Sequence, residues 1–339
     1  MKTEEEKMSM TKITADTRPI DIEELKPYAD FLMYKCIPVD RPAVEMTFAE
    51  MNRNQPTWDV DSMIRGMERL REAAKERRVM YDVYTEQECE DDPEKKDIKV
   101  FFLPAKVQPS DKPFIICVAG GAYTCVCSIV ESFPTAARFN ELGYNVFVFN
   151  YRVGNGTKPV LPAPEEDLAA AVKFILANKS EFGLANEEYV VNGYSAGGSV
   201  TTIFGTERNG WAKYGCPRPK ALFPIYPAIS TAPEFMEEPG MRAWFMGIMF
   251  GPNFDSEYAK SFDVPECMTD SYPPCFITQA KDDPAVSVKQ SIALERLLKE
   301  RGIPVCAEII EAGGHGWGDG SGTDAAGWPD RAARFLESI

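Results

Sequence analysis

From about residue 79 onward, short apolar segments alternate with longer segments whose apolar residues recur every three or four positions. The short segments are rich in β-branched and aromatic residues and predict strands over residues 79–85, 98–103, 114–119, 145–150, 189–191, 221–225, 275–279 and 304–310. The longer segments predict helices over residues 133–142, 163–178, 199–204, 287–301 and 327–339. The first two strands, joined by an acidic loop, predict an antiparallel hairpin at the sheet edge. The whole pattern predicts an α/β fold: a mostly parallel, eight-stranded sheet with helices on both faces.

Two stretches lie outside this alternation. The pattern over residues 20–78 predicts helices without strands, and we expect residues 1–12 to form a disordered tail. Residues 228–272 form an insertion rich in proline, methionine and aromatic residues, with no clear period. We therefore expect an N-terminal tail and helical extension over 1–78 and a main domain over 79–339 that contains the insertion. Both stretches are candidates for a lid over the sheet.

The chain carries 37 basic and 52 acidic residues, which gives a net charge of −15. A strongly acidic protein repels nucleic-acid phosphates and anionic membrane surfaces, so we expect neither as a partner. The charged start of the sequence is followed by no apolar signal segment, and no apolar run reaches the length of a membrane span. These features favour a cytoplasmic protein. They leave the oligomeric state open, with a homodimer as one option.

Nine cysteines are scattered along the chain without the spacing of a disulfide framework. Several lie in predicted strands, as Cys117, Cys275 and Cys306 do, and we expect them to behave as small buried apolar residues in a reducing compartment. The close pair Cys125 and Cys127 would need further ligands to hold a metal ion, and the chain has a single histidine. We therefore expect no metal site.

The strongest chemical signal follows the predicted strand at 189–191. Residues 193–197 match the pattern Gly-x-Ser-x-Gly and lie between a predicted strand and a predicted helix. In this context the pattern is typical of a nucleophile elbow, a strained turn that projects the serine Oγ above the sheet while the glycines leave room for neighbouring backbone. The N–H of Ala196 then faces the position where negative charge develops. Ser195 is therefore the candidate nucleophile.

A serine nucleophile needs a base, and the base needs an orienting carboxylate. The only histidine of the chain, His315, lies in a glycine-rich loop just after the last predicted strand. Parallel sheets place their ligands at this end of a strand, so His315 is the candidate base. Asp282 and Asp283 follow the preceding strand and compete for the orienting role. We favour Asp283, because the Asp-x-x-Val pattern opens the following helix.

The oxyanion site requires further backbone N–H donors. The predicted strand at 114–119 runs directly into Gly120-Gly121-Ala122. Glycines let the backbone approach a substrate carbonyl and turn its N–H groups inward. Gly121 and Ala122, together with Ala196, are therefore the candidate oxyanion donors, although an ordinary glycine turn would have the same sequence.

These segments resemble the α/β-hydrolase superfamily. Within it, the chain is most similar to the serine esterases described as acetyl xylan esterase-like or feruloyl esterase-like, near the hormone-sensitive-lipase group. The resemblance covers roughly residues 79–339 and rests on four segments, 120–123, 143–153, 161–168 and 193–198, which the Asp283 and His315 regions match in pattern. It implies the same triad and oxyanion residues as above. It departs from the pattern at Ala119 and Ala122, where the family often has His or Pro and Gly, and the methyl group of Ala122 favours a small acyl group.

The triad and the resemblance together predict a serine carboxylesterase for short acyl esters, above all acetyl esters, acting through an acyl-enzyme without a cofactor or metal ion. The partner is then a small-molecule or oligosaccharide ester, and the resemblance alone implies acetylated xylo-oligosaccharides. Three alternatives remain: a feruloyl or broader carboxylesterase or lipase, a serine peptidase of the same fold, and a non-catalytic binding protein. A peptidase would need a propeller, for which residues 1–78 are too short, or an acidic pair that holds a substrate amine.

Aromatic residues near the predicted site are candidates for stacking on a sugar ring. Tyr123 and Tyr194 adjoin the oxyanion loop and the elbow, and Trp317 follows the base, so these three are the candidate substrate contacts. Trp244 and Phe245 lie in the insertion. Aromatic residues at such positions also form hydrophobic cores, and the sequence does not separate the two roles.

Overall fold

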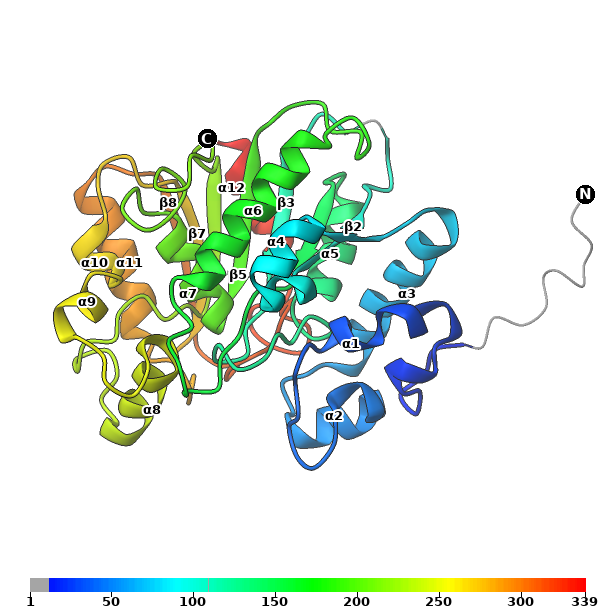
Figure 1. Ribbon diagram of the computed structural model, residues 1–339, viewed down its shortest axis with the longest axis horizontal. Coiled ribbons are helices and arrows are strands. Elements are labelled where there is room, and N and C mark those ends of the chain that lie inside the picture. The colour runs from blue at the N-terminus through cyan, green and yellow to red at the C-terminus, as the bar shows by residue number, and fades with distance from the viewer. Residues whose placement is uncertain (1–11, 109) are drawn as a thin grey trace, which may run out of the picture.

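Eight strands form one sheet within residues 12–108 and 110–339, the part of the chain that the computed structural model describes. They are β1 (Met80–Asp82), β2 (Lys99–Leu103), β3 (Phe114–Val118), β4 (Val146–Phe149), β5 (Tyr189–Tyr194), β6 (Ala221–Ile225), β7 (Cys275–Ala280) and β8 (Val305–Ile310). Their order is β1-β2-β4-β3-β5-β6-β7-β8 (Figure 1). The β1–β2 and β2–β4 pairs are antiparallel and the others parallel. The predicted eight-stranded sheet and its antiparallel edge hairpin are confirmed.

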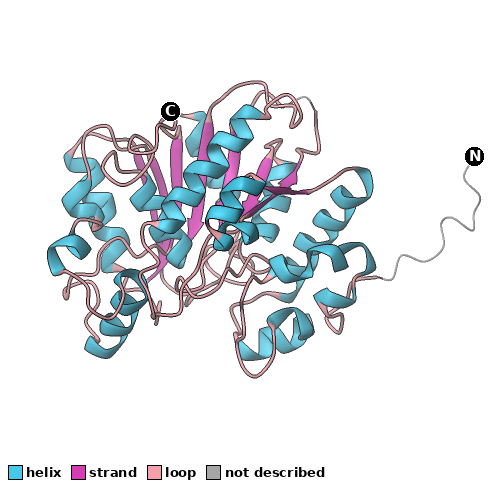
Figure 2. Ribbon diagram, viewed as in Figure 1, coloured by secondary structure: helices cyan, strands magenta, loops and turns pink. Residues whose placement is uncertain are grey.

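The central strands are buried along their whole length because helices cover both faces of the sheet (Figure 2). Every residue of β3 to β7 is buried. One apolar layer takes side chains from α6 (Ala163–Ala177), α7 (Ser195–Phe204) and α11 (Lys289–Glu300). The layer on the other face takes them from α3 (Val60–Glu76), α5 (Ser132–Glu141) and α12 (Trp328–Glu337). In the described part of the chain, no helix has both the length and the apolar character needed to cross a membrane.

The N-terminal region packs against the outside of α5. It contains α1 (Ala29–Leu32), α2 (Phe48–Asn54) and α3. The Asp59 side chain accepts a hydrogen bond from the Ser62 N–H at 2.8 Å and so caps α3. Gly66 lets α3 and α5 approach closely, because a Cβ there would lie 2.8 Å from the backbone nitrogen of Pro134. The expected tail over 1–12 lies, except for residue 12, outside the described residues.

The expected loop over residues 86–97 and the insertion over residues 228–272 are both partly helical. Residues 86–97 contain α4 (Glu86–Asp91) and a 3₁₀ helix, and residues 228–272 contain α8 (Pro239–Phe250), α9 (Ser256–Lys260) and α10 (Val264–Cys267). Capping side chains start α4, α8 and α9, since Thr85, Glu238 and Asp255 each accept a hydrogen bond from the first turn. These helices were missed because caps rather than apolar periodicity define them.

The parallel strands position the candidate residues. Strands β3, β5, β7 and β8 run in the same direction, so the loops at their carboxyl ends meet at one edge of the sheet. In Figure 1, α2 and α8 lie on opposite sides of this edge.

Candidate active site

The turn between β5 and α7 holds Ser195 in a left-handed backbone conformation, with φ of 51°. This conformation costs a residue with a side chain roughly 1–2 kcal/mol. The neighbouring glycines are required by close approach. A Cβ on Gly193 would lie 2.2 Å from the carbonyl oxygen of Gly197, and a Cβ on Gly197 would lie 2.1 Å from that of Val118. The turn therefore has the strained, tightly packed geometry of a nucleophile elbow.

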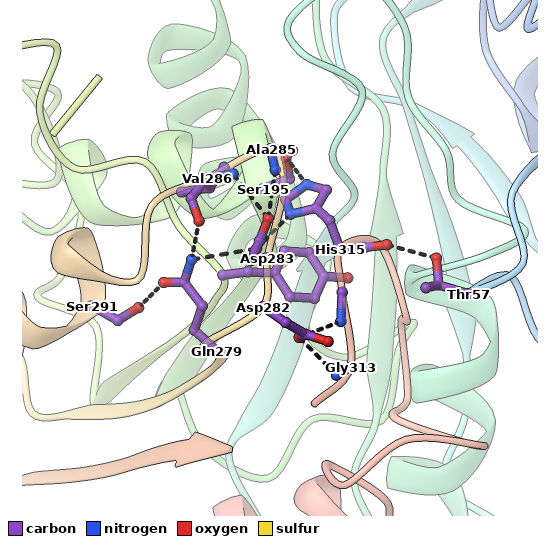
Figure 3. A network of polar contacts seen from close by, with 12 residues as sticks. Thr57, Ser195, Gln279, Asp282, Asp283, Ala285, Val286, Ser291, Gly313 and His315 are labelled. Carbon is purple, nitrogen blue, oxygen red and sulfur yellow. Dashed lines mark hydrogen bonds and ion pairs between the residues drawn. The ribbon is translucent and has the colours of Figure 1, made fainter. Parts of the chain in front are cut away.

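His315 joins Ser195 to Asp283 (Figure 3). Its Nε2 lies 2.8 Å from Ser195 Oγ, and its Nδ1 lies 2.8 Å from Asp283 Oδ2. The Asp283 side chain is fully buried, whereas that of His315 is 16% exposed. In this arrangement the imidazole can accept the serine proton at Nε2, while the carboxylate stabilises the tautomer that carries hydrogen on Nδ1.

Asp283 is fixed by bonds on both of its oxygens. Its Oδ1 accepts hydrogen bonds from the N–H groups of Ala285 and Val286 at 2.8 and 2.9 Å. Gln279 Nε2 lies 3.3 Å from Asp283 Oδ2 and donates to the carbonyl of Val286 at 2.7 Å. Ser291 in turn donates to Gln279 Oε1 at 2.6 Å. Sequence reasoning missed Gln279, although its place four residues before Asp283 at the end of β7 was visible.

Asp282 contacts the backbone of the loop that carries His315 rather than the histidine ring. Its Oδ1 accepts hydrogen bonds from the N–H groups of Gly313 and Gly314, both at 2.9 Å (Figure 3). The bond from Gly314 is the main cause that lowers the pKa of the Asp282 carboxyl. Asp282 therefore anchors the backbone of the loop that carries His315, while Asp283 contacts the ring itself.

The loop after β3 presents unused N–H groups beside Ser195. Gly121, Ala122 and Tyr123 have φ values of 136°, 53° and 61°. A Cβ on Gly121 would lie 2.2 Å from the carbonyl oxygen of Cys125, so only glycine fits there. Among the described residues, no hydrogen bond uses the N–H of Gly121 or Ala122. Both residues line the cavity that contains Ser195 and Ala196, where their N–H groups can serve a substrate oxygen.

The buried carboxyl of Glu131 holds the loop after β3 in place. Glu131 is 4% exposed, and its two oxygens accept hydrogen bonds from the Gly120 N–H and the Tyr226 hydroxyl. Burial raises the pKa of Glu131 to about 7. The Tyr226 ring also packs against His315, with ring centroids 4.7 Å apart. Glu131 therefore connects the loop after β3 to the aromatic ring that packs against His315, a contact that the sequence pattern did not indicate.

The N-terminal region contacts the base loop directly. Thr57 Oγ1 donates to the carbonyl oxygen of His315 at 2.6 Å, and Gln55 Nε2 adds a longer bond of 3.3 Å to the same oxygen. Thr57 is drawn beside His315 in Figure 3. Neither residue belongs to a motif, and nothing local in the sequence pointed to them.

A cavity of about 940 Å³ opens above Ser195 and His315. One wall comes from the N-terminal region and includes Cys36, Gln55 and Trp58. The opposite wall comes from the insertion and its helix α8, with Phe235, Met236, Met241, Trp244 and Phe245. Both stretches named as lid candidates therefore border the site.

The three expected substrate contacts are not at this cavity. Tyr123, Tyr194 and Trp317 are at most 2% exposed, and none lines the cavity. The Tyr194 hydroxyl donates to Asn192 Oδ1 at 2.8 Å, and Trp317 packs against the ring of Tyr226. All three side chains turn into the core. The exposed aromatic side chain on the cavity wall is instead Trp244, at 51% exposure.

Comparison with known proteins places the chain among hydrolases. Residues 162–338 match the model of the prolyl oligopeptidase family, and residues 100–214 match the BD-FAE model. The endo-1,4-β-xylanase B of Butyrivibrio fibrisolvens is 28% identical over 221 residues, which cover 63% of this chain and 34% of that protein. The acetylxylan esterase of Xylanibacter ruminicola is 26% identical over 229 residues, which cover 66% and 44%. The chain thus spans less than half the length of these curated relatives.

Solved structures share the fold over most of the chain. An acetyl ester-xyloside bifunctional hydrolase from Caldicellulosiruptor lactoaceticus superposes with a TM-score of 0.65 at 25% identity, covering 77% of this chain and 96% of that one. A sugar hydrolase from Lactococcus lactis gives a TM-score of 0.57 at 28% identity, covering 71% and 94%.

Proposed function

Because this chain belongs to the prolyl oligopeptidase family of α/β hydrolases, and its structural neighbours are esterases and sugar hydrolases, we propose that it is a serine carboxylesterase for short acyl esters, acetyl esters above all. The catalytic residues are then Ser195, His315 and Asp283. The observation that carries the proposal is the continuous hydrogen-bonded chain from Ser195 through His315 to buried Asp283 at the floor of an open cavity.

In this mechanism Ser195 Oγ attacks the ester carbonyl carbon while His315 Nε2 takes its proton. The carbonyl oxygen becomes negatively charged and is held by the N–H groups of Gly121, Ala122 and Ala196. One such donor typically stabilises the transition state by ~2.7–4 kcal/mol. The alcohol leaves with the proton from His315, and water then releases the acyl group by the same steps. The chain's own residues supply every proton transfer.

We extend the proposal to acetylated sugars, with xylo-oligosaccharides as the first class to test. The relatives named above for xylan and acetyl-ester chemistry support this choice. The cavity offers two tryptophans on opposite walls, Trp58 and Trp244, whose flat apolar faces suit sugar rings. The methyl group of Ala122 on the oxyanion loop favours a small acyl group.

A peptidase is the second candidate, because the matched family is named for one and an acidic pair, Glu237 and Glu238, lines the cavity. Both carboxylates are engaged, however. Glu238 caps α8 by accepting from the N–H groups of Gly240 and Met241, and Glu237 pairs with Lys289. Neither is free to hold a substrate amine without losing its partner, which favours the esterase.

The proposal is tested by hydrolysis of p-nitrophenyl esters from acetate to octanoate, methyl ferulate, acetylated xylo-oligosaccharides and a dipeptide p-nitroanilide. Ser195→Ala should lose activity, and Ser338→Ala, far from the site, should keep it. Acetate turnover that falls by butyrate supports the acetyl assignment. A preference for octanoate or ferulate would replace that assignment, and cleavage of the anilide alone would favour a peptidase. Full activity in Ser195→Ala would overturn the catalytic role of Ser195.

A further inference from the structure

Three cysteines meet beside the oxyanion loop, although they come from distant parts of the chain. Cys36 follows α1, while Cys125 and Cys127 follow β3. The Sγ atoms of Cys125 and Cys127 are 3.8 Å apart, and those of Cys36 and Cys127 are 3.9 Å apart. All three lie within 4.8 Å of one another. In the sequence, Cys125 and Cys127 lack the further ligands that a metal ion would need. The fold supplies a third ligand, Cys36, which lies 91 positions from Cys127 and which no local spacing revealed.

Two of the three sulfur–sulfur distances, 3.8 and 3.9 Å, match those between ligands of one metal ion, and the third pair lies within 4.8 Å. A tetrahedral zinc–thiolate site has Zn–S bonds of about 2.3 Å, which sets neighbouring sulfur atoms about 3.8 Å apart. A disulfide would need the sulfur atoms at about 2.05 Å. Joining one pair as a disulfide would also leave the third thiol without its partners, whereas a metal uses all three.

The site is reachable from solvent. All three cysteines line the cavity above Ser195, so an ion can enter from solvent. Within the described ranges no fourth cysteine, histidine or carboxylate joins the group. Water from the cavity can supply the fourth ligand of a bound ion.

We propose that Cys36, Cys125 and Cys127 form a binding site for a thiophilic divalent cation such as Zn²⁺, which ties the N-terminal region to the oxyanion loop. Binding replaces three thiol protons, which pass to solvent, and it involves no change of oxidation state. The tie reaches the loop through its backbone. The N–H of Cys125 donates to the carbonyl of Gly121 at 3.1 Å, and that of Cys127 donates to the carbonyl of Gly120 at 3.0 Å.

The test uses Co²⁺ as a spectroscopic substitute for Zn²⁺. The full chain is reduced, stripped of metal with a chelator and titrated with Co²⁺ under anaerobic conditions. We expect one Co²⁺ per chain, with an intense sulfur-to-cobalt charge-transfer absorption that Zn²⁺ abolishes by displacement. Ser195→Ala should give the same titration, because the site does not use the serine, so the result is independent of the proposed esterase function.

Cysteine variants identify the ligands. Cys36→Ser, Cys125→Ser and Cys127→Ser should each weaken Co²⁺ binding at least about 100-fold. Cys306→Ser, which removes a partly exposed thiol on β8, should bind like the parent protein. If a variant unfolds, the Co²⁺ spectrum of the parent protein still shows whether the thiols bind the metal ion. No charge-transfer band in the reduced parent chain, or an unchanged band in folded Cys36→Ser, would overturn the site, and the three thiols would then be packing residues.

Discussion

Thr57 donates its hydroxyl hydrogen to the carbonyl oxygen of His315 at 2.6 Å, across 258 positions of the sequence. His315 is thereby held from three sides: Asp283 contacts its ring, Asp282 anchors the preceding glycines, and Thr57 anchors its own carbonyl. The helical N-terminal region thus contributes to the geometry of the site as well as to packing.

Replacing Thr57 by Val should lower kcat/KM about two- to tenfold, because the lost hydrogen bond is worth roughly 0.5–1.5 kcal/mol and the ring of His315 loses part of its support. Thr57→Ser should restore most of the activity, since it keeps the hydroxyl. The measurement is steady-state hydrolysis of p-nitrophenyl acetate, with the exposed Thr14→Val as control. Equal losses in Thr57→Ser and Thr57→Val would assign the effect to packing instead.

Asp283→Asn should reduce kcat by on the order of 10³–10⁴, because an amide favours the wrong histidine tautomer. Asp282→Asn should cost less than about tenfold, because the amide oxygen can still accept from Gly313 and Gly314. The comparison requires both variants at matched protein concentration and with thermal unfolding as a folding check. A larger loss in Asp282→Asn would show that the two aspartates have been assigned the wrong way round.

Glu131 should make stability depend on pH. Its folded pKa, about 7, is raised from an ordinary value of 4.5, so between these values the folded chain binds more protons than the unfolded chain. The free energy of unfolding must then fall as pH rises through this window, by about 3 kcal/mol in total. Glu131→Gln mimics the neutral form, so its stability relative to the parent should increase between pH 5 and pH 8.

Urea denaturation at the two pH values measures this difference, with the exposed Glu90→Gln as control. If Glu131→Gln and the parent protein lose stability in parallel, the buried carboxyl does not titrate in this range.

Ala122→Gly should widen the acyl side of the site. The variant removes a methyl group that lines the cavity and frees a residue with φ of 53° from left-handed strain. One additional methylene bound in that space is worth about 0.8 kcal/mol, so the butyrate-to-acetate ratio of kcat/KM should rise about fourfold. Parallel thermal unfolding checks that the loop remains folded. A ratio that stays the same or falls would place the acyl group elsewhere.

Trp244→Ala should raise KM for acetylated xylo-oligosaccharides about five- to tenfold more than KM for p-nitrophenyl acetate. The reason is that the sugar ring loses a stacking surface worth about 1 kcal/mol or more. The control is Phe254→Ala, at another exposed position after α8. Trp211→Ala would not serve, because Trp211 packs against the core. Equal changes for both substrates would remove Trp244 from the sugar site.

The strands and the proximity of Ser195, His315 and Asp283 could be predicted because each leaves a local mark on the sequence. A strand covered on both faces is a short apolar run, and a nucleophile elbow needs Gly193 and Gly197 at fixed spacing around Ser195. His315 was identifiable because the chain has one histidine, at the end of a strand. These marks arise from backbone geometry over a few residues, which a sequence displays directly.

The residues that support the site leave no such mark. Thr57, Glu131 and Cys36 act through partners that the fold brings to them, and no periodicity connects position 57 with position 315 or position 36 with position 127. The errors at Tyr123, Tyr194 and Trp317 have the same origin. Proximity in sequence to a site residue does not determine the direction of a side chain, and all three turn inward.

The Thr57–His315 hydrogen bond joins residues that are synthesised far apart in time, because 258 positions separate them in the sequence. A ribosome makes residues 55–58 long before residue 315, so the hydrogen-bond partner of Thr57 is absent during most of synthesis. Until residue 315 is made, Ser195 lacks its hydrogen bond to His315. The hydrogen-bonded chain from Ser195 through His315 to Asp283 is therefore completed only after β8 and the loop that follows it.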